Sequence, residues 1–333
     1  MKIVAFEVEQ WESEILKETA EGIEITHVQE RLSSENAAKY QDVEIMSIFI
    51  YSKVDSEILE NFPNLKMIAT RSSGYDHIDI DYCKERGIAV CYVPSYGEKA
   101  VAEHVFALLL SISHRMVESL DRTRRGDFSN AGLRGFDLAG KTHGVIGTGE
   151  IGMHTIRISQ GFGMKVLGFD IHPNCEMEAE LGFRYTEMQE LLAQSDVISL
   201  HVPATPQTNK MISTEQFNAM KEGVILINTA RGTVVDSRAL LDALSKGKVA
   251  AAGLDVLPEE PVIREEAVLL SNFFNKKHNM ETLLADHILL RMRNVIITPH
   301  NAFNTEEAVR LILETTVKNI QAFLHGEAEN QIS

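Results

Sequence analysis

The stretch GVIGTGEIG, residues 144–152, indicates which fold the chain adopts. It begins as an apolar run and places glycines at 147, 149 and 152, in the pattern G-x-G-x-x-G. The residues from Ile151 onward have apolar side chains at helical spacing, and the next apolar run ends at Asp170. Glycines also occur in ordinary turns between a strand and a helix. The complete order of strand, glycine turn, helix, strand and acidic residue is typical of a dinucleotide-binding βαβ unit.

The spacing of Gly147, Gly149 and Gly152 predicts a phosphate-binding turn. Glycines let backbone N–H groups approach a pyrophosphate, and the N-terminus of the following helix favours negative charge. Asp170 is then expected to accept hydrogen bonds from the adenosine ribose. A carboxylate there repels the 2′-phosphate of NADP, and the next residues, IHPNC, offer His172 but no arginine to offset it. We therefore expect NAD as the cofactor.

Short apolar runs alternate with helical patterns on both sides of this stretch, which predicts βαβ units and parallel sheets. The predicted strands before it are 2–8, 44–51, 65–70 and 88–93, and those after it are 164–170, 196–202, 223–230, 249–256 and 294–299. A helix long enough to bridge two domains is expected at 98–115, and an amphipathic helix at 306–324. The polar segment TRRGDFSNAGLRG, 123–135, is expected to be irregular or to form an arm.

Length, charge and cysteine usage limit the class of protein. A chain of 333 residues suits two domains better than one. A net charge of -16 disfavours nucleic acid and anionic membranes as partners. The three cysteines lack C-x-x-C spacing, so neither a metal site nor a disulfide framework is expected. The chain turns acidic too early for a signal peptide, and its longest apolar run is shorter than a membrane span. We expect a cytoplasmic globular protein.

Three of the later apolar runs lead to chemically active side chains. The run at 224–228 is followed by Arg231, the run at 249–257 by Glu260, and the run at 295–299 by His300. Because ligands of parallel sheets bind at the carboxyl ends of the strands, we expect the three side chains to lie together. Taken singly, Arg231 resembles a helix cap or surface ion pair, Glu260 a solvated glutamate and His300 a turn residue.

Together these residue types form the set that reduction of a 2-oxoacid needs. Arginine grips a planar carboxylate with two N–H donors. Histidine carries a proton near neutral pH and passes it to a carbonyl oxygen. A carboxylate orients the histidine and favours its charged form.

An ordered set of stretches resembles the D-2-hydroxyacid dehydrogenase family over nearly the whole chain. The set consists of ATRSSGYDHIDI (69–80), VPSYGEKAVAEH (93–104), GVIGTGEIG (144–152), DVISLHVPATPQT (196–208), LINTARG (226–232), GLDVLPEEP (253–261) and TPHNAFNT (298–305). The long segment between Glu260 and His300 is similar to the D-lactate dehydrogenase branch. The resemblance therefore implies interconversion of a small D-2-hydroxy acid and its 2-oxoacid, with D-lactate and pyruvate as the expected pair.

The resemblance also implies roles for individual residues. Arg231 would bind the substrate carboxylate and carbonyl, His300 would be the acid and base, and Glu260 would hold His300. The backbone N–H groups of Ser73 and Gly74 would take the substrate carboxylate, so the valine that many relatives have at position 73 matters little. Tyr96 and Phe303 would line the substrate pocket. The implied cofactor contacts are Gly147, Gly149, Glu150, Ile151, Gly152, Asp170, Val202, Pro203, Thr208, Thr229, Ala230, Arg231 and Asp255.

The architecture implied by the resemblance is α/β, with two doubly wound parallel-sheet domains and a cleft between them. A flavodoxin-like substrate domain would comprise 1–97 plus 300–333, and a Rossmann NAD-binding domain 98–299, through which the chain would form a homodimer. Formate-oxidising relatives have glutamine in the role of Glu260, and phosphite-oxidising relatives have lysine in the stretch that matches RSSGYD; neither mark is present. Two alternatives stay open, a reductase for bulkier 2-oxoacids and an NADH-sensing transcriptional scaffold, although the net charge of -16 disfavours the scaffold.

Overall fold

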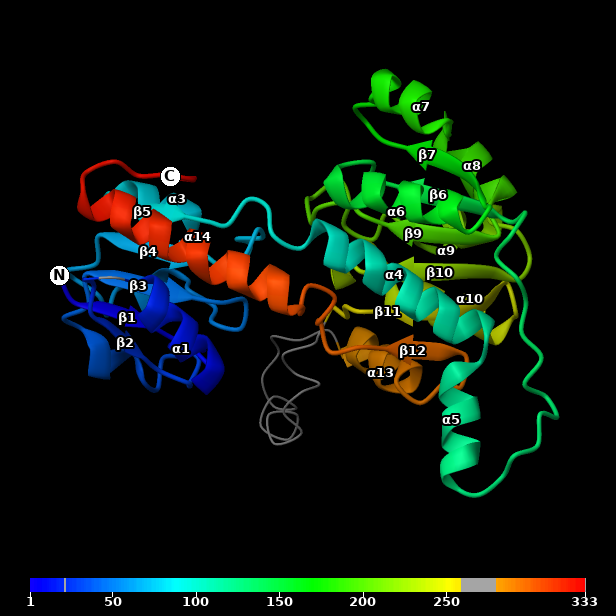
Figure 1. Cartoon of the computed structure of the whole chain (residues 1–333), viewed down its shortest axis with the longest axis horizontal. Helices are drawn as coiled ribbons and strands as arrows, with labels where there is room; N and C mark the ends of the chain where they lie inside the picture. Colours follow the sequence, from blue (N-terminus) through cyan, green and yellow to red (C-terminus); the bar gives the residue numbers. More distant parts are fainter. Residues whose placement is uncertain (21, 259–279, 333) are drawn as a thin grey trace. The chain divides into compact units, whose positions relative to one another are not determined.

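The structure, a computed structural model, describes residues 1–20, 22–258 and 280–332 (Figure 1). The chain divides into two compact units: unit 1 comprises Met1–Gly97 and Asn304–Ser333, and unit 2 comprises Glu98–Phe303. The second change of unit therefore follows Phe303, whereas the sequence led us to expect it before residue 300. The difference arises because the backbone N–H groups of residues 300–302 bind Asp255, which keeps this segment in unit 2.

Unit 1 contains a five-stranded parallel sheet in the order β2-β1-β3-β4-β5. Its strands are β1 (Ile3–Ala5), β2 (Ile25–His27), β3 (Ile45–Ile48), β4 (Met67–Thr70) and β5 (Ala89–Cys91). This is the flavodoxin-like strand order, so the fold expected for this part of the chain is confirmed. The edge strand β2 was not expected from the sequence.

Helices cover both faces of the unit 1 sheet. The helices are α1 (Gln10–Thr19), α2 (Ser56–Leu59), α3 (Ile80–Arg86) and α14 (Glu306–Leu324), with a 3-10 turn, η1, at Ala37–Tyr40. Side chains of successive strand residues alternate between the faces, so Ile3 packs with Ile320 of α14, while Val4 packs in the cluster that contains Leu59 of α2. A helix from the end of the chain thus completes a sheet built at its start.

The β5 edge of this sheet is paired with residues near the end of the chain. Tyr92 N–H donates to Asn330 O at 3.1 Å, and Ile332 N–H donates to Val90 O at 2.8 Å. A further bond runs from Asn319 Nδ2 of α14 to Tyr92 O at 2.9 Å. These bonds satisfy backbone groups that an uncovered edge strand would present to other chains.

Unit 2 contains a seven-stranded sheet in the order β12-β11-β10-β9-β6-β7-β8, and all its strand pairs are parallel. The strands are β6 (Thr142–Ile146), β7 (Lys165–Phe169), β8 (Arg184–Tyr185), β9 (Val197–Leu200), β10 (Val224–Asn228), β11 (Val249–Leu254) and β12 (Val295–Ile297). Starting from β8, this is the Rossmann order 3-2-1-4-5-6 with one further strand, which confirms the expected fold. The order reverses between β6 and β9, so the carboxyl ends of these strands mark the place where such sheets bind ligands.

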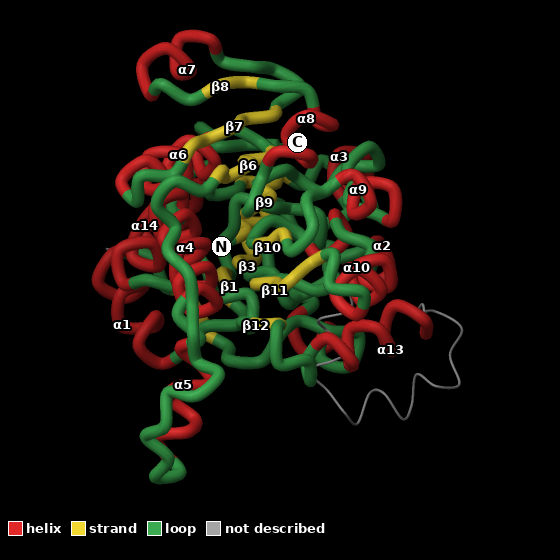
Figure 2. The backbone as a smooth tube through the Cα atoms, turned by 90° about the vertical axis from the view of Figure 1, so that its right-hand side faces the viewer, coloured by secondary structure: helices red, strands yellow, loops and turns green. Residues whose placement is uncertain are grey.

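Helices lie on both faces of this sheet, with α4 and α6 on one side and α9, α10 and α13 on the other (Figure 2). In the described part of unit 2 the helices are α4 (Glu98–Ser113), α5 (Met116–Arg124), α6 (Glu150–Gly161), α7 (Cys175–Leu181), α8 (Met188–Gln194), α9 (Thr214–Ala219), α10 (Ser237–Ser245) and α13 (Met280–Leu289), with a 3-10 turn, η2, at Gly232–Val234. The expected helix at 98–115 is α4, and its buried residues Val105, Phe106 and Leu109 pack against β10.

The helix α5 was not expected from the sequence. It follows α4 after a bend of 63°, none of its residues is buried, and it extends away from the sheet of unit 2 (Figure 1). The irregular segment expected at 123–135 begins where α5 ends. Among the described residues, no single helix combines the length and apolar composition of a membrane span; α4 and α5 meet those criteria only when taken together.

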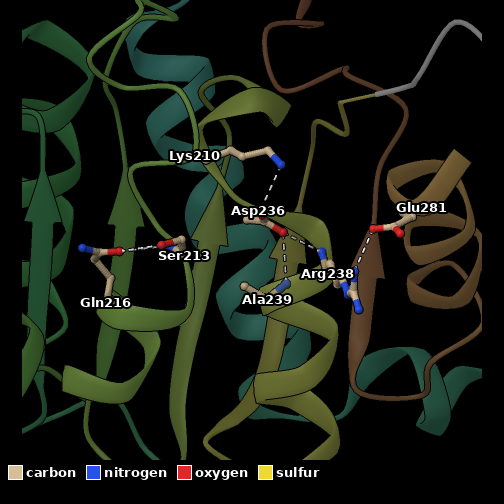
Figure 3. A network of polar contacts seen from close by, with 7 residues as sticks. All are labelled: Lys210, Ser213, Gln216, Asp236, Arg238, Ala239 and Glu281. Atoms are coloured by element: carbon tan, nitrogen blue, oxygen red, sulfur yellow. Dashed lines mark hydrogen bonds and ion pairs between the residues drawn. The ribbon is translucent and has the colours of Figure 1, made fainter. Parts of the chain in front are cut away.

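A polar network fixes the start of α10 (Figure 3). Asp236 accepts from the backbone N–H groups of Arg238 and Ala239 at 3.0 and 3.1 Å, and pairs with Lys210 at 3.0 Å. Burial opposes ionisation of Asp236, but Lys210 and the two N–H donors outweigh it and lower the pKa of this carboxyl. Arg238 pairs with Glu281 at 2.7 Å, which ties α10 to α13. The network anchors the chain a few residues beyond the end of β10.

A chain of buried polar side chains crosses unit 2 from α6 to the end of β9. His143 Nδ1 lies 2.8 Å from Ser159 Oγ, its Nε2 lies 2.9 Å from Ser199 Oγ, and Ser199 Oγ lies 2.9 Å from His201 Nε2. Burial lowers the pKa of His143 to about 3. Burial, followed by the nearby His143, lowers the pKa of His201 to about 3. Both rings are therefore neutral at physiological pH.

Candidate active site

The glycine turn between β6 and α6 has the shape that a bound pyrophosphate needs. Gly147 has a φ of 88°, and a Cβ there would lie 2.7 Å from the carbonyl oxygen of His201. A Cβ at Gly152 would collide with the carbonyl oxygen of Gly147, so α6 approaches the turn closely. In contrast, a Cβ at Gly149 would meet no atom within 4 Å. Two glycines thus allow tight packing, and the third leaves open space at the N-terminus of α6, beside Glu150 and Ile151.

Asp170 ties the glycine turn to the neighbouring strand β7. Its Oδ2 accepts from Thr148 N at 2.7 Å and from Thr148 Oγ1 at 3.2 Å, and its Oδ1 accepts from His172 N at 2.9 Å. Thr148 Oγ1 is also 2.7 Å from the hydroxyl of Tyr185. The carboxylate is half-buried beside the exposed residues that follow β7, and its oxygens retain further lone pairs for a ribose.

The loop after β9 carries the predicted cofactor residues Val202, Pro203 and Thr208. The Thr208 hydroxyl donates to Pro203 O at 2.5 Å and accepts from Thr205 N at 2.8 Å. The Thr208 hydroxyl therefore stabilises the loop that carries Val202 and Pro203. The backbone N–H of His201, just before them, donates to Ile146 O at 2.7 Å and joins the loop to the end of β6.

Arg231 is delivered by a tight turn at the end of β10. The buried Asn228 accepts from Ala230 N at 3.0 Å and donates to Arg231 O at 3.0 Å. Arg231 Nη1 donates to Ala230 O at 2.8 Å, and its side chain is part-buried. A Cβ at Gly232 would collide with the backbone of Leu257, which follows β11. The turn after β10 is thus packed directly against the chain after β11.

Thr229 lies in the same turn. Its hydroxyl is buried and, among the residues that the structure describes, has no hydrogen-bond partner. A buried hydroxyl without a partner is unfavourable, at a cost of about 1–3 kcal/mol.

His300 and Asp255 are brought together by bonds between the ends of β11 and β12. His300 N donates to Asp255 O at 2.9 Å. The Asp255 carboxylate is 1% exposed and accepts from Asn301 N at 3.0 Å, Ala302 N at 2.9 Å and Thr298 Oγ1 at 2.5 Å. Asp255 N in turn donates to Asn228 O at 2.9 Å, which connects this cluster with the turn that carries Arg231. Arg231 and His300 therefore lie at the carboxyl ends of β10 and β12, on either side of β11.

Two further predicted site residues are Glu260 and Phe303. Glu260 lies outside the described residues, so its predicted contact with His300 stays a prediction. Phe303, the last residue of unit 2, is half-buried.

The remaining predicted site residues belong to unit 1. Ser72 Oγ donates to Gly74 O at 2.6 Å, and Val93 N donates to Ser72 O at 3.1 Å, which fixes the turn after β4. Within the described part of the chain, the N–H groups of Ser73 and Gly74 donate to no protein acceptor, so they are available to an anion. Tyr96 is half-buried just before α4.

Comparison with known proteins identifies the family. Residues 106–302 match the model of the D-isomer specific 2-hydroxyacid dehydrogenase NAD binding domain. The chain belongs to the D-isomer specific 2-hydroxyacid dehydrogenases. As a member of this family it uses NAD, and a structural relative has been solved with NAD bound.

Relatives of this dehydrogenase differ in the substrates that their names state. The D-lactate dehydrogenase of Escherichia coli (strain K12) is 36% identical over 98% of both chains. The glyoxylate reductase of Thermococcus litoralis is 38% identical over 87% of this chain and 83% of its own. The crystal structure of D-lactate dehydrogenase from Aquifex aeolicus complexed with NAD and lactic acid is 39% identical, covers 98% of this chain and 96% of its own, and has a TM-score of 0.85.

The sequence did not point to His104. This residue of α4 lies 3.0 Å from Thr298 Oγ1 and 3.5 Å from Asp255 Oδ1, through its Nε2 atom. In the sequence His104 appears only as a polar residue in a long, mainly apolar helix. Its connection to the end of β12 depends on how α4 packs across the sheet.

Proposed function

We propose that this dehydrogenase interconverts a small D-2-hydroxy acid and its 2-oxoacid, with D-lactate and pyruvate as the preferred pair. The proposal rests on the positions of Arg231 and His300. They follow β10 and β12, the two strands on either side of β11, and Asp255 follows β11 itself. An arginine for a carboxylate and a histidine for a proton are the groups that this reaction requires.

The two side chains have complementary roles in the proposed reaction. Arg231 binds the substrate carboxylate and polarises the carbonyl, while the Ser73 and Gly74 N–H groups bind the carboxylate as well. In reduction the carbonyl carbon gains a hydride, and the carbonyl oxygen takes a proton from His300; in oxidation His300 takes that proton back. The bound cofactor would supply the hydride as NADH in reduction and accept it as NAD⁺ in oxidation. Glu260 would stabilise the protonated imidazole, and Tyr96 and Phe303 would limit the size of the substrate side chain.

The cofactor is proposed to lie along the carboxyl ends of β6, β7, β9 and β10. The open face at Gly149 and the first N–H groups of α6 suit the pyrophosphate, and Asp170 suits the adenosine ribose. Val202 and Pro203 would flank the adenine side. Thr229, Ala230 and Asp255 would lie towards the nicotinamide, where the Thr229 hydroxyl would gain the partner that it lacks.

Cofactor selectivity tests the role of Asp170. We expect kcat/KM with NADH to exceed that with NADPH by at least about tenfold, or roughly 1.4 kcal/mol, because the carboxylate repels a 2′-phosphate. Steady-state kinetics with both cofactors measure the ratio, and Asp170→Ser should narrow it. Equal efficiency with both cofactors in the wild type would contradict the assignment.

Substrate choice is tested by a panel of 2-oxoacids of increasing size. NADH oxidation is measured with glyoxylate, pyruvate, 2-oxobutyrate, 4-methyl-2-oxopentanoate and phenylpyruvate, and the chirality of each chiral product is assigned by chiral chromatography. We expect the highest kcat/KM with pyruvate and a D product throughout. A maximum at phenylpyruvate would favour the reductase for bulkier 2-oxoacids, and one at glyoxylate would favour the activity named for the Thermococcus litoralis relative. An L product or no turnover on any member would contradict the proposal.

We infer that two copies of the chain associate through α5 and the segment after it. Met116, Val117 and Leu120 of α5 are exposed, and Phe128 is 83% exposed. Apolar surface gathered on a projecting helix is typical of a protein interface, and most homodimers pair identical patches. Light scattering should give twice the chain mass of 37.2 kDa. Leu120→Glu should lower that mass, whereas Leu311→Glu, on an exposed position of α14, should not; a monomeric wild type would refute the inference.

A further inference from the structure

His300 has a backbone conformation that needs an explanation. Its φ of 54° is in the left-handed region, which is unfavourable for a residue with a side chain. This conformation turns the N–H groups of Asn301 and Ala302 towards the Asp255 carboxylate, while the His300 N–H donates to the backbone oxygen of Asp255. Backbone concavities of this kind, called nests, bind anions, and here the anion is the buried Asp255 carboxylate. Asp255 therefore holds His300 in its strained conformation.

A second set of bonds reaches the same carboxylate from α4. Thr298 Oγ1 donates to Asp255 Oδ1. This bond uses the single hydroxyl proton, so Thr298 can only accept from His104 Nε2, 3.0 Å away. The Nε2 atom of His104 therefore carries a hydrogen. Both hydrogen bonds therefore have the same direction: the His104 ring donates to the Thr298 hydroxyl, and the Thr298 hydroxyl donates to the Asp255 carboxylate.

We propose that His104 is a positioning residue for the acid/base step, and that it acts on His300 through Thr298 and Asp255. The inference rests on the proposed function, because it takes His300 as the group that transfers the proton. The polar contacts of the His104 ring among the described residues are with Thr298 and Asp255, and the side chain is 18% exposed. From α4, His104 is thus placed to fix the orientation of the Thr298 hydroxyl.

The physical effect of His104 is on the Thr298 hydroxyl. With the His104 N–H in place, the hydroxyl is fixed as a donor to Asp255. Without it, the hydroxyl can rotate towards other acceptors, and the carboxylate loses one of its donors. The remaining bonds then hold the nest less firmly, and the His300 ring visits positions from which proton transfer is slow. Small displacements of a catalytic group are sufficient to reduce kcat strongly.

Two matched pairs of variants test the proposal. His104→Leu and Thr298→Val remove the bridging hydrogen bonds, whereas His104→Gln and Thr298→Ser retain an N–H and a hydroxyl. We expect kcat per NADH-binding site to fall about tenfold in the Leu and Val variants. It should stay near the wild-type value in the Gln and Ser variants, and NADH affinity should stay within about twofold in all four. Counting binding sites by NADH fluorescence excludes misfolded protein from the comparison.

A measurement without turnover keeps the proposal testable in variants of low activity. The ring resonances of His300 in the cofactor-free protein are identified by their loss in His300→Ala. We expect Thr298→Val to shift them and Thr298→Ser to leave them in place. Unshifted His300 resonances in Thr298→Val, or wild-type kcat in both the Leu and Val variants, would overturn the proposal.

The same variants separate the two levels of inference. If His300→Ala is inactive while the Leu and Val variants are fully active, the positioning role of His104 is wrong and the proposed function stands. If His300→Ala turns over 2-oxoacids at the wild-type rate, the acid/base role in the proposed function is wrong.

Discussion

At the scale of single residues, Asn228 and Gly232 fix the backbone turn that carries Arg231. Asn228 closes the turn with two hydrogen bonds, and Gly232 lets the chain after β11 approach. Arginine suits this place because its planar group presents two parallel donors to a carboxylate, whereas a lysine offers a single charged centre. The proposed function therefore depends on the shape of this side chain as well as on its charge.

Arg231→Lys tests that dependence. We expect kcat/KM for pyruvate to fall on the order of 100-fold, or about 2.7 kcal/mol, while the Kd for NADH stays unchanged. Arg238→Lys is the matched control, because Arg238 makes an exposed pair with Glu281, and it should leave kcat/KM unchanged. If Arg231→Lys weakens NADH binding by the same factor, the residue supports the turn instead of binding the substrate.

Thr229→Val tests the unsatisfied hydroxyl. Valine has the same shape and no polar atom, so it removes a cost that is about 1–3 kcal/mol for a buried group without a partner. We expect the free energy of unfolding of the cofactor-free protein to rise, on the order of 1 kcal/mol, and NADH affinity to fall severalfold. Thr316→Val, which removes a satisfied hydroxyl in α14, should give no such rise. Thermal unfolding and NADH titration measure the two effects. Unchanged NADH affinity would show that the Thr229 hydroxyl does not contact the cofactor.

At the scale of secondary-structure elements, the N-terminus of α10 connects stability with pH. Asp236→Ala removes the cap, and we expect a loss of about 1 kcal/mol at pH 7. The pKa of Asp236 is lowered in the folded protein, so its stabilisation is complete above the unfolded pKa of about 3.9 and is lost as pH falls through the folded value. The difference between wild type and variant should therefore shrink below about pH 4. Urea denaturation at pH 7 and pH 3 measures it.

The control lies on the same helix. Asp242→Ala removes an exposed pair with Lys246, for which we expect a change of only about 0–0.5 kcal/mol. Equal losses in the two variants would mean that Asp236 contributes no more than a surface charge.

The elements that the sequence predicted well are those with continuous apolar runs, such as β6 and β10, because both faces of these strands are buried. Two of the four edge strands, β2 and β8, were missed for the opposite reason. β2 has no buried residue, and β8 consists of Arg184–Tyr185 alone, so neither has a hydrophobic pattern. α5 was missed because it buries nothing within its own unit.

The site shows the same division between local and tertiary information. Arg231 and His300 were predicted because each follows an apolar strand directly. Asp255 was predicted only as a cofactor residue, since nothing in the sequence indicates that the segment 298–302 folds around its carboxylate. His104 was not recognised because its contact with Thr298 joins residues far apart in the chain.

At the scale of the whole molecule, the buried His143 should make folding sensitive to acid. Its pKa is about 3 in the folded protein and about 6.5 when unfolded, so between these values only the unfolded chain takes up a proton. Stability is therefore complete above about pH 6.5 and falls as pH decreases, by about 2 kcal/mol at pH 5.

His143→Leu removes this contribution. We expect the free energy of unfolding of the variant to decline less steeply than that of the wild type between about pH 6.5 and pH 4. The two slopes should differ by up to about 1.4 kcal/mol per pH unit, the value for one proton taken up on unfolding. Urea denaturation followed by circular dichroism at a series of pH values measures the two slopes. Parallel slopes would show that another group governs the loss of stability in acid.

Unit 1 is assembled from two parts of the chain that are synthesised at different times. Its sheet is made first, but α14 and the residues that pair with β5 leave the ribosome only after all of unit 2. At about 5–20 residues per second, that interval is on the order of 10–40 s. During it the strand face that packs against Ile320 lacks α14, whereas the last strand of unit 2, β12, is made before α14 and leaves the sheet of unit 2 complete first. We therefore expect the N-terminal part of unit 1 to need chaperone protection during synthesis. Unit 1 is begun first, but its folding is completed last.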